Sequence, residues 1–141
     1  IGATYVSSND VPPAEIAARF GAIDVVYEAA GASKVAFETM QALGANSIFV
    51  FTGVPGRKGP VEIDTDLVMR NLVLRNQMIL GTVNAGRDAF EAAIRDVGEF
   101  GRRWPKALRA LISGRHAPEK YRELLLGRPS GIKHVISFAE N

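Results

Sequence analysis

The chain of 141 residues contains no cysteine and no long apolar run. Without cysteine it can form neither a disulfide nor a zinc site with thiolate ligands. No apolar stretch approaches the roughly 20 residues that a helix needs to cross a bilayer. We therefore expect a cytoplasmic protein with no membrane partner.

The common phosphate-binding motifs are also missing. No G-x-G-x-x-G follows a strand-like segment, so the pyrophosphate-binding turn of a complete dinucleotide-binding fold is absent. Segment 53–59 is rich in glycine, but Lys58 is followed by Gly59 where a P-loop has Ser or Thr. Pro55 removes an amide that a phosphate cradle would use. The pattern predicts a surface turn at this segment.

The net charge is small, +2, although the second half of the chain carries many basic residues. They are Arg95, Arg102, Arg103, Lys106, Arg109, Arg115, Lys120 and Arg122. Acidic residues are interleaved with them, at Asp88, Glu91, Asp96, Glu99, Glu119 and Glu123. No aromatic side chains alternate with the bases to form a stacking platform. This mixture is typical of solvated helix surfaces, and we expect no nucleic-acid partner.

Candidate catalytic and metal-binding groups are scarce. His116 and His134 lie far apart in the sequence without the spacing of paired metal ligands. Asp24 and Glu28 lie in or beside a predicted strand, where a structural role is expected. The sequence predicts no catalytic acid, base or nucleophile and no metal ligand on this chain.

Strand-like and helix-like segments alternate along the sequence, which predicts an α/β fold with a parallel sheet. The predicted strands are residues 4–6, 24–28, 48–51, 78–83 and 133–138. The first predicted helix begins near 10–13 and ends at Gly21, and the second begins at a Ser33 cap, continues along Ala36, Met40 and Leu43, and ends at Gly44. A third covers 66–75 behind a Thr65 cap, and a fourth contains the apolar stripe Phe90, Ala93, Ile94 and Val97. Two shorter helices are predicted over 105–113 and 118–126.

Small and polar residues follow three of these strands, at 29–31, 52–54 and 82–84. In open parallel sheets, ligands bind beyond the carboxyl ends of the strands. Small residues at one strand end can equally make a tight turn. Three such ends in succession favour a ligand crevice in which backbone groups approach a flat ligand.

The order of several motifs resembles a known family. They are Gly2-Ala3-Thr4-Tyr5-Val6, Asp24-Val25-Val26-Tyr27-Glu28-Ala29-Ala30-Gly31, Asn71-Leu72-Val73-Leu74-Arg75-Asn76 and Gly81-Thr82-Val83-Asn84. The chain resembles the zinc-dependent glucose dehydrogenases of archaeal type, in the medium-chain dehydrogenase/reductase superfamily. The resemblance extends from the third strand of the family's nucleotide-binding domain to the C-terminus, and includes Trp104-Pro105, Ile112, Ile132-Lys133 and Val135-Ile136.

The resemblance implies a set of cofactor-binding residues: Ala30, Gly31, Thr52, Gly53, Val54, Val83 and Asn84. In the family, the backbone matching 52–54 holds the nicotinamide carboxamide, the residue matching Asn84 lies near the ring and the substrate, and the turn matching 29–31 approaches the ribose. Many members have threonine in place of Ala30 and aromatic residues in place of Thr52 and Val54. We therefore expect backbone contacts more than side-chain contacts.

The implied chemistry is hydride transfer from C1 of an aldose to the nicotinamide of NADP or NAD, with gluconolactone as the product. The family's catalytic zinc and its ligands belong to the N-terminal domain, which is not on this chain. We expect the parent enzyme to bind a small sugar and to be a homo-oligomer. The alternatives are a dehydrogenase for another sugar or polyol, and a standalone α/β binding domain without a cofactor.

The same resemblance implies an incomplete domain. Residues 1–141 would be the C-terminal half of the NAD(P)-binding domain with the C-terminal tail, a part of a Rossmann-like sheet that lacks the first two strands. With strand order 3-2-1-4-5-6, the missing strands would lie between residues 4–6 and 24–28. We expect the isolated chain to be inactive, to rearrange or associate through open strand edges, and to leave the strand at 133–138 without a partner. The start at Ile1, directly before a strand-like run, fits a piece of a longer protein.

Overall fold

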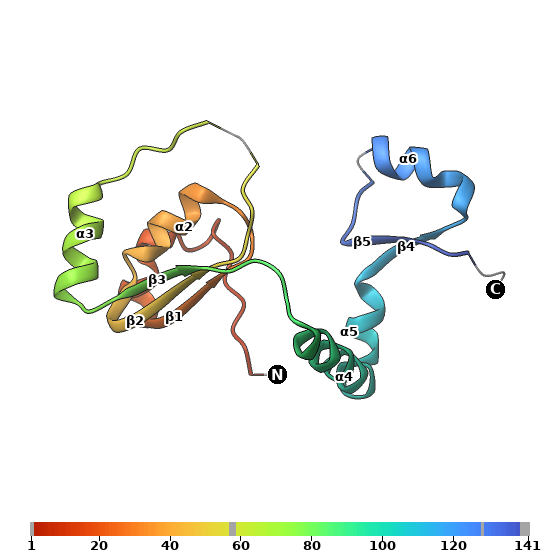
Figure 1. The fold of residues 1–141 in the computed structure, drawn as a ribbon, viewed down its shortest axis with the longest axis horizontal. Helices are drawn as coiled ribbons and strands as arrows, with labels where there is room; N and C mark the ends of the chain where they lie inside the picture. The colour runs from red at the N-terminus through yellow and green to blue at the C-terminus, as the bar shows by residue number, and fades with distance from the viewer. Residues whose placement is uncertain (1, 57–58, 128, 139–141) are drawn as a thin grey trace. The chain divides into compact units, whose positions relative to one another are not determined.

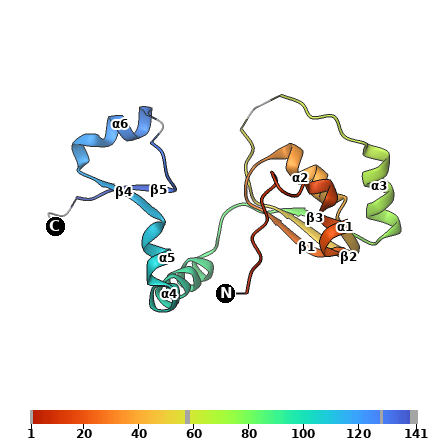
Figure 2. The same cartoon turned by 180° about the vertical axis from the view of Figure 1, so that it is seen from behind.

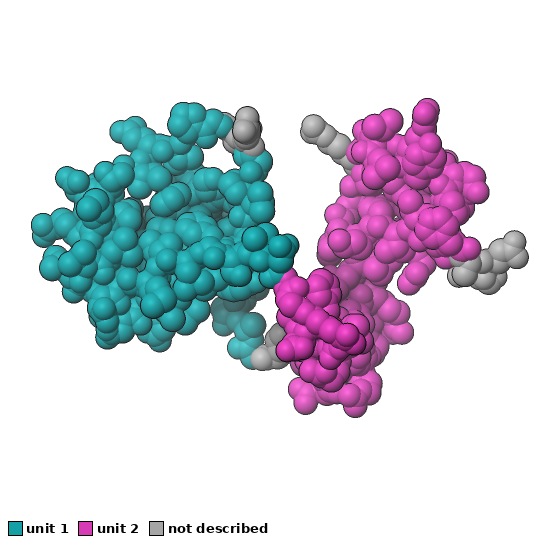
Figure 3. All heavy atoms as spheres, in the orientation of Figure 1, with its two compact units in different colours: residues 1–84 teal, residues 85–141 magenta. Residues whose placement is uncertain are grey.

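The computed structural model describes residues 2–56, 59–127 and 129–138 (Figure 1). Arg57 and Lys58 of the predicted surface turn lie outside the described residues. The chain divides into two units, Ile1–Asn84 and Ala85–Asn141, coloured teal and magenta in Figure 3.

The first unit is built around a three-stranded parallel sheet with strand order β1-β2-β3 (Figure 1). Its elements are η1 (Pro13–Glu15), α1 (Ile16–Phe20), β1 (Ile23–Glu28), α2 (Ser33–Met40), β2 (Leu43–Phe51), α3 (Thr65–Leu74) and β3 (Met78–Gly81). Helical segments connect the successive strands, as parallel pairing requires. The prediction of an α/β fold with a parallel sheet and flanking helices is confirmed.

One face of this sheet carries the core of the unit. Phe49 of the middle strand β2 is completely buried, and it packs with Ala36 and Met40 of α2 and with Leu43. Figures 1 and 2 show α2 lying against the sheet from two opposite views. Val26 and Ile79 flank Phe49 on the neighbouring strands and are partly buried against the same core.

The opposite face of the sheet is much less covered. Since side chains alternate along a strand, Val25 and Tyr27 of β1 point away from the core, and they are 60% and 68% exposed. Met78 of β3 is 55% exposed at the corresponding register position. Parallel sheets are usually covered on both faces, so this face is incomplete as it stands.

The second unit contains α4 (Arg87–Arg103), α5 (Pro105–Ala110), β4 (Ile112–His116), η2 (Pro118–Lys120), α6 (Tyr121–Leu126) and β5 (Lys133–Ile136). β4 and β5 pair in parallel. The helical stripe predicted through Phe90, Ile94 and Val97 lies on α4, but these three side chains are 63%, 73% and 50% exposed. No helix of the described residues is long and apolar enough to span a membrane.

The strand predicted at residues 4–6 is wrong. Residues 2–7 have no regular secondary structure, and Tyr5 is 90% exposed. A strand is stabilised by a neighbour that satisfies its amides and carbonyls, and no described strand pairs with this segment. The expected gap between it and β1 is therefore absent from the described sheet.

Three helix boundaries differ from the predictions. Leu43 and Gly44 belong to β2 instead of the preceding helix, and Leu43 pairs with Ile23, because the spacing of a few apolar residues does not separate a helix end from a strand start. Ser33 is the first residue of α2 and caps nothing. The cap of α3 is Asp64, whose carboxylate accepts a hydrogen bond from the Leu67 amide at 2.9 Å, and not Thr65.

The helix predicted over 105–113 ends at Ala110 and is followed by β4, a strand that was not predicted. The expectation that the last strand lacks a partner is also wrong. β5 pairs with β4 from Ile112↔Lys133 to His116↔Ile136. The short run of β4 contains serine and glycine, so neither its composition nor its length marks it as a strand.

Candidate functional site

The ends of the three strands of the first unit lie level with one another. Glu28 of β1 pairs with Phe51 of β2, and Phe51 pairs with Gly81 of β3. The segments 29–31, 52–54 and 82–84 therefore leave the sheet at one edge, the carboxyl edge at which α/β proteins bind ligands. This arrangement agrees with the sequence prediction.

The turns that follow β1 and β2 are in direct contact through two glycines. A Cβ added to Gly53 would lie 2.2 Å from the Gly31 amide nitrogen, and one added to Gly31 would lie 2.7 Å from the carbonyl oxygen of Val54. Gly31 also has a φ of 62°, a conformation that favours glycine. At both positions the missing side chain makes room for the neighbouring turn, and not for a ligand as the small residues predicted.

Glu28 connects these two turns by hydrogen bonds. Its Oε1 atom accepts from the amides of Ala30 at 2.9 Å, Gly31 at 2.7 Å and Ala32 at 3.4 Å. Its main-chain carbonyl accepts from the Thr52 and Gly53 amides, at 2.9 and 3.0 Å, and from the Thr52 hydroxyl at 2.8 Å. The structural role expected for Glu28 is confirmed, and it is more specific than its place in a strand suggested.

A hollow of about 290 Å³ lies beyond the ends of β2 and β3. Its lining consists of Phe51, Thr52, Gly53, Val54, Gly81, Thr82 and Val83. Val54 and Val83 are 82% and 74% exposed, so two apolar side chains flank an open, mostly small-residue surface. Such a surface suits a flat, partly apolar group held by backbone contacts.

The predicted cofactor-binding residues lie in three places: in the hollow, in the turn next to it, and outside both. Four of them line this hollow: Thr52, Gly53, Val54 and Val83. Ala30 and Gly31 lie in the adjacent turn, whose amides donate to Glu28. Asn84 is exposed, has a φ of 68° and does not line the hollow. Their assignment to a cofactor stays a prediction.

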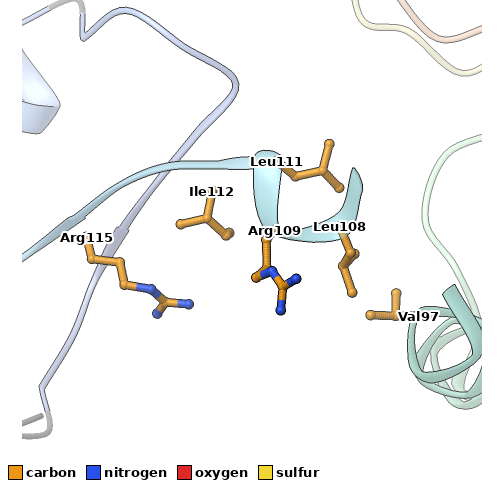
Figure 4. A pocket seen from close by; sticks show the side chains of 6 residues that line it. All are labelled: Val97, Leu108, Arg109, Leu111, Ile112 and Arg115. Atoms are coloured by element: carbon orange, nitrogen blue, oxygen red, sulfur yellow. The ribbon is translucent and has the colours of Figure 1, made fainter. Parts of the chain in front are cut away.

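A larger cavity, of about 590 Å³, lies within the second unit (Figure 4). Figure 4 shows its lining, which comes from α4, from α5 and from Leu111 and β4 that follow it: Val97, Leu108, Arg109, Leu111, Ile112 and Arg115. It contains none of the predicted site residues. Among the described residues, the lining combines aliphatic side chains with two guanidinium groups and holds no carboxylate, histidine or hydroxyl that could act as an acid or base.

The two histidines, which lie far apart in the sequence, are neighbours in the structure. His116 Nε2 and His134 Nδ1 are 2.9 Å apart, and His134 Nε2 lies 2.9 Å from the Ser130 carbonyl oxygen. Parallel pairing of β4 and β5 brings together residues that are distant in sequence. Gly114 makes room for both rings, since a Cβ there would lie 2.6 and 2.7 Å from the two bonded nitrogens.

The histidine pair does not extend to a metal centre. Among the described residues, no three His, Cys, Asp or Glu side chains are grouped so that they could hold a metal ion. The two rings are joined by a single hydrogen bond, which is a structural contact between two strands.

Several charges of the predicted mixed surface form ion pairs along their helices. Glu99 pairs with Arg102 and Arg103 on α4. Lys120 of η2 lies with its Nζ atom 2.9 Å from Oε2 of Glu123 in α6, and the hydrogen bond that Lys120 donates lowers the pKa of the Glu123 carboxyl below its usual value. These pairs agree with a solvated, mixed-charge surface.

Comparison with known proteins extends over nearly the whole chain. Residues 1–138 match the family described as glucose dehydrogenase C-terminus. The chain is 34% identical to glucose 1-dehydrogenase 2 of Haloterrigena turkmenica, over 98% of this chain and 38% of that protein. It is 31% identical to glucose 1-dehydrogenase of Methanocella arvoryzae, over 96% of this chain and 38% of that protein. The chain thus spans less than two fifths of the length of these relatives.

Solved structures agree with this comparison. Glucose dehydrogenase of Haloferax mediterranei, in complex with NADP, Zn and gluconolactone, superposes with a TM-score of 0.76 at 28% identity, over 98% of this chain and 38% of that one. An alcohol dehydrogenase zinc-binding domain protein of Burkholderia ambifaria shares the fold, with a TM-score of 0.69 at 18% identity over 96% of this chain and 36% of that one. The resemblance inferred from the sequence motifs is confirmed: the chain belongs to the glucose dehydrogenase C-terminus family.

Proposed function

We propose that this chain is the C-terminal, cofactor-binding portion of an NADP- or NAD-dependent glucose 1-dehydrogenase. The observation that carries the proposal is the family match over residues 1–138, with relatives that are glucose 1-dehydrogenases. The hollow beyond β2 and β3 supports it, because it lies at the sheet edge where α/β folds bind dinucleotides.

The residues at this edge fit the nicotinamide half of such a cofactor. Backbone groups of Thr52, Gly53 and Val54 hold the carboxamide, while the exposed side chains of Val54 and Val83 cover the ring and exclude water. Ala30 and Gly31 approach the ribose. Asn84, at the outer end of the third segment, lies toward the substrate. The Thr52 and Gly53 amides donate to the Glu28 carbonyl, so carbonyl oxygens of this segment are the groups that we expect to accept from the carboxamide.

The bound cofactor supplies the hydride acceptor, the nicotinamide C4, for a hydride from C1 of the sugar. The chain's own contribution is to orient the ring and keep water from it. The described residues offer no zinc site, so we assign the metal ligands and the proton-transfer groups to parts of the enzyme outside this chain. NADP is the favoured cofactor, because the Haloferax mediterranei relative was solved with NADP.

The direct test is an activity assay of the longer protein that we propose contains this chain. Reduction of NADP or NAD should be followed at 340 nm with glucose, other aldoses and polyols as substrates. We expect glucose to be oxidised with the highest kcat/KM. Turnover confined to polyols would transfer the assignment to another dehydrogenase of the superfamily, and an absence of turnover and cofactor binding would overturn it.

The isolated chain offers a second test. It lacks the glycine-rich pyrophosphate-binding turn, so we expect millimolar affinity for NADP or none by isothermal titration calorimetry. Micromolar binding would contradict the idea that the site is completed by other residues.

We also propose that the enzyme is a cytoplasmic homo-oligomer without nucleic-acid or membrane partners. The absence of cysteine supports a cytoplasmic location. The mixed-charge helices support the absence of a nucleic-acid partner. The uncovered apolar side chains of β1 and α4 support association. Light scattering of the longer protein would report its subunit number, and a monomer would contradict this part.

A further inference from the structure

The carboxylate of Glu28 lies between the two turns that form one side of the proposed cofactor site. Glu28 is the last residue of β1 and is only 9% exposed. A carboxylate in this position is stable only if hydrogen bonds replace the water that it has lost. Oε1 obtains them from three consecutive amides, those of Ala30, Gly31 and Ala32. One oxygen atom thus determines the path of the turn from β1 into α2.

The same side chain also touches the second turn. A Cβ on Gly53 would lie 2.6 Å from Glu28 Oε2, so the carboxylate fills the space beside Gly53. The main-chain carbonyl of Glu28 accepts from the Thr52 and Gly53 amides, which ties the start of this turn to the end of β1. Main-chain bonds survive a change of side chain, whereas the contact at Gly53 and the three bonds to Oε1 do not.

We propose that Glu28 is a positioning residue: its carboxylate holds the turns at 29–31 and 52–54 in the relative position that cofactor binding requires. The inference rests on the proposed function, and it names a residue that touches neither cofactor nor substrate. Without the carboxylate, three amides lose their acceptor and the space beside Gly53 is empty, so both turns can shift. A shift of a binding surface weakens binding even when the fold persists.

Three substitutions in the longer enzyme separate this role from a merely structural one. Glu28→Gln keeps an oxygen that can accept from the amides and nearly the same shape, whereas Glu28→Ala removes the acceptor. Glu28→Asp keeps the charge but shortens the reach, and it serves if the alanine variant fails to fold. Asp24→Asn is the matched control, since Asp24 is an exposed carboxylate on the same strand.

The measurements are the Kd of NADP by calorimetry, kcat with saturating glucose and NADP, and the thermal unfolding midpoint. We expect the Kd to rise about tenfold or more in Glu28→Ala and Glu28→Asp, since neither side chain places an acceptor oxygen within reach of the three amides and part-buried donors without an acceptor are costly. We expect a rise of less than about threefold in Glu28→Gln, no change in Asp24→Asn, and a kcat at saturation that falls much less than the affinity.

A lower unfolding midpoint with an unchanged Kd in folded Glu28→Ala or Glu28→Asp would show a merely structural role and overturn the inference. Equal loss of affinity in Glu28→Gln and Glu28→Ala would also overturn it, because the amide oxygen would then fail as a substitute acceptor. If the unsubstituted enzyme binds neither NADP nor NAD, the proposed function itself fails. Unchanged affinity in the variants of a cofactor-binding enzyme would reject only the role of Glu28.

Discussion

Gly53 occupies the point where the turns after β1 and β2 come closest. A methyl group there would meet the backbone of Gly31 at 2.2 Å from the nitrogen and 2.8 Å from Cα, and backbone cannot move aside as a flexible side chain can. We expect Gly53→Ala to lower the free energy of unfolding of this chain by about 1–3 kcal/mol, the usual cost of overpacking. Urea denaturation would measure it.

The matched control for this change is Gly56→Ala, three residues further along the same segment. A Cβ at Gly56 has nothing within 4 Å, and Gly56 is not among the glycines with positive φ. Its substitution should change stability by no more than about 0.5 kcal/mol. Equal destabilisation by both substitutions would show that the contact between the two turns is not the cause.

The hydrogen-bond partners of the histidine pair determine its tautomers. The Ser130 carbonyl oxygen only accepts, so His134 Nε2 carries a proton and donates to it. In the neutral ring, His134 Nδ1 is then the acceptor for a proton on His116 Nε2. Nitrogen-15 NMR at pH 8 should show both rings protonated at Nε2. A protonated Nδ1 on His134 would contradict the arrangement.

Among single residues, those that act through local rules could be anticipated from the sequence, and those that act through long-range contacts could not. Gly21 ends α1, as its position after Phe20 predicted. The role of Glu28 depends on a turn from another strand, and the contact between His116 and His134 depends on the pairing of β4 with β5. The only sequence signal for Glu28 was a carboxylate at the end of an otherwise mostly apolar strand.

At the scale of elements, two consecutive residues of β1 point to opposite faces of the sheet, one of them packed and the other exposed. Val26 is partly buried against the core around Phe49, and Val25, on the other face, is 60% exposed. Replacement of valine by threonine keeps the shape and adds a hydroxyl. We expect Val26→Thr to destabilise this chain by about 1–3 kcal/mol, because a buried hydroxyl lacks a partner there. Val25→Thr should change stability by no more than about 0.5 kcal/mol.

Urea denaturation of the two variants compares the faces directly. A larger loss in Val25→Thr than in Val26→Thr would mean that the outer face is packed in solution. The self-association that open edges and bare faces predict should also weaken in Val25→Thr, which size-exclusion chromatography would show.

The elements themselves were predictable where an apolar run had the length and flanking turns of a regular strand, as in β2 and β3. Leu43 was predicted to belong to a helix, because Ala36, Met40 and Leu43 have the spacing of one helix face, but Leu43 is the first residue of β2. The strand β4, whose serine and glycine carry no strand signal, was not predicted, and a strand was predicted at residues 4–6, where no described neighbour provides hydrogen bonds. In each case a tertiary partner decided the outcome.

At the scale of the whole molecule, this chain spans about 38% of the length of the relatives that it matches and exposes large apolar side chains on both of its units. Val25 and Tyr27 on the sheet and Phe90 and Ile94 on α4 are each at least 60% exposed. These surfaces agree with a cofactor site that other parts of a longer protein complete. The extent of that protein could not be worked out from local patterns, whereas the order of motifs along the chain indicated the family.

The most direct measurement is a crystal structure of the longer protein with NADP bound. We expect the nicotinamide to lie in the hollow beyond β2 and β3, in contact with Gly53, Val54 and Val83, while the turn held by Glu28 faces the ribose. A cofactor bound elsewhere, with this hollow filled by protein side chains, would contradict it.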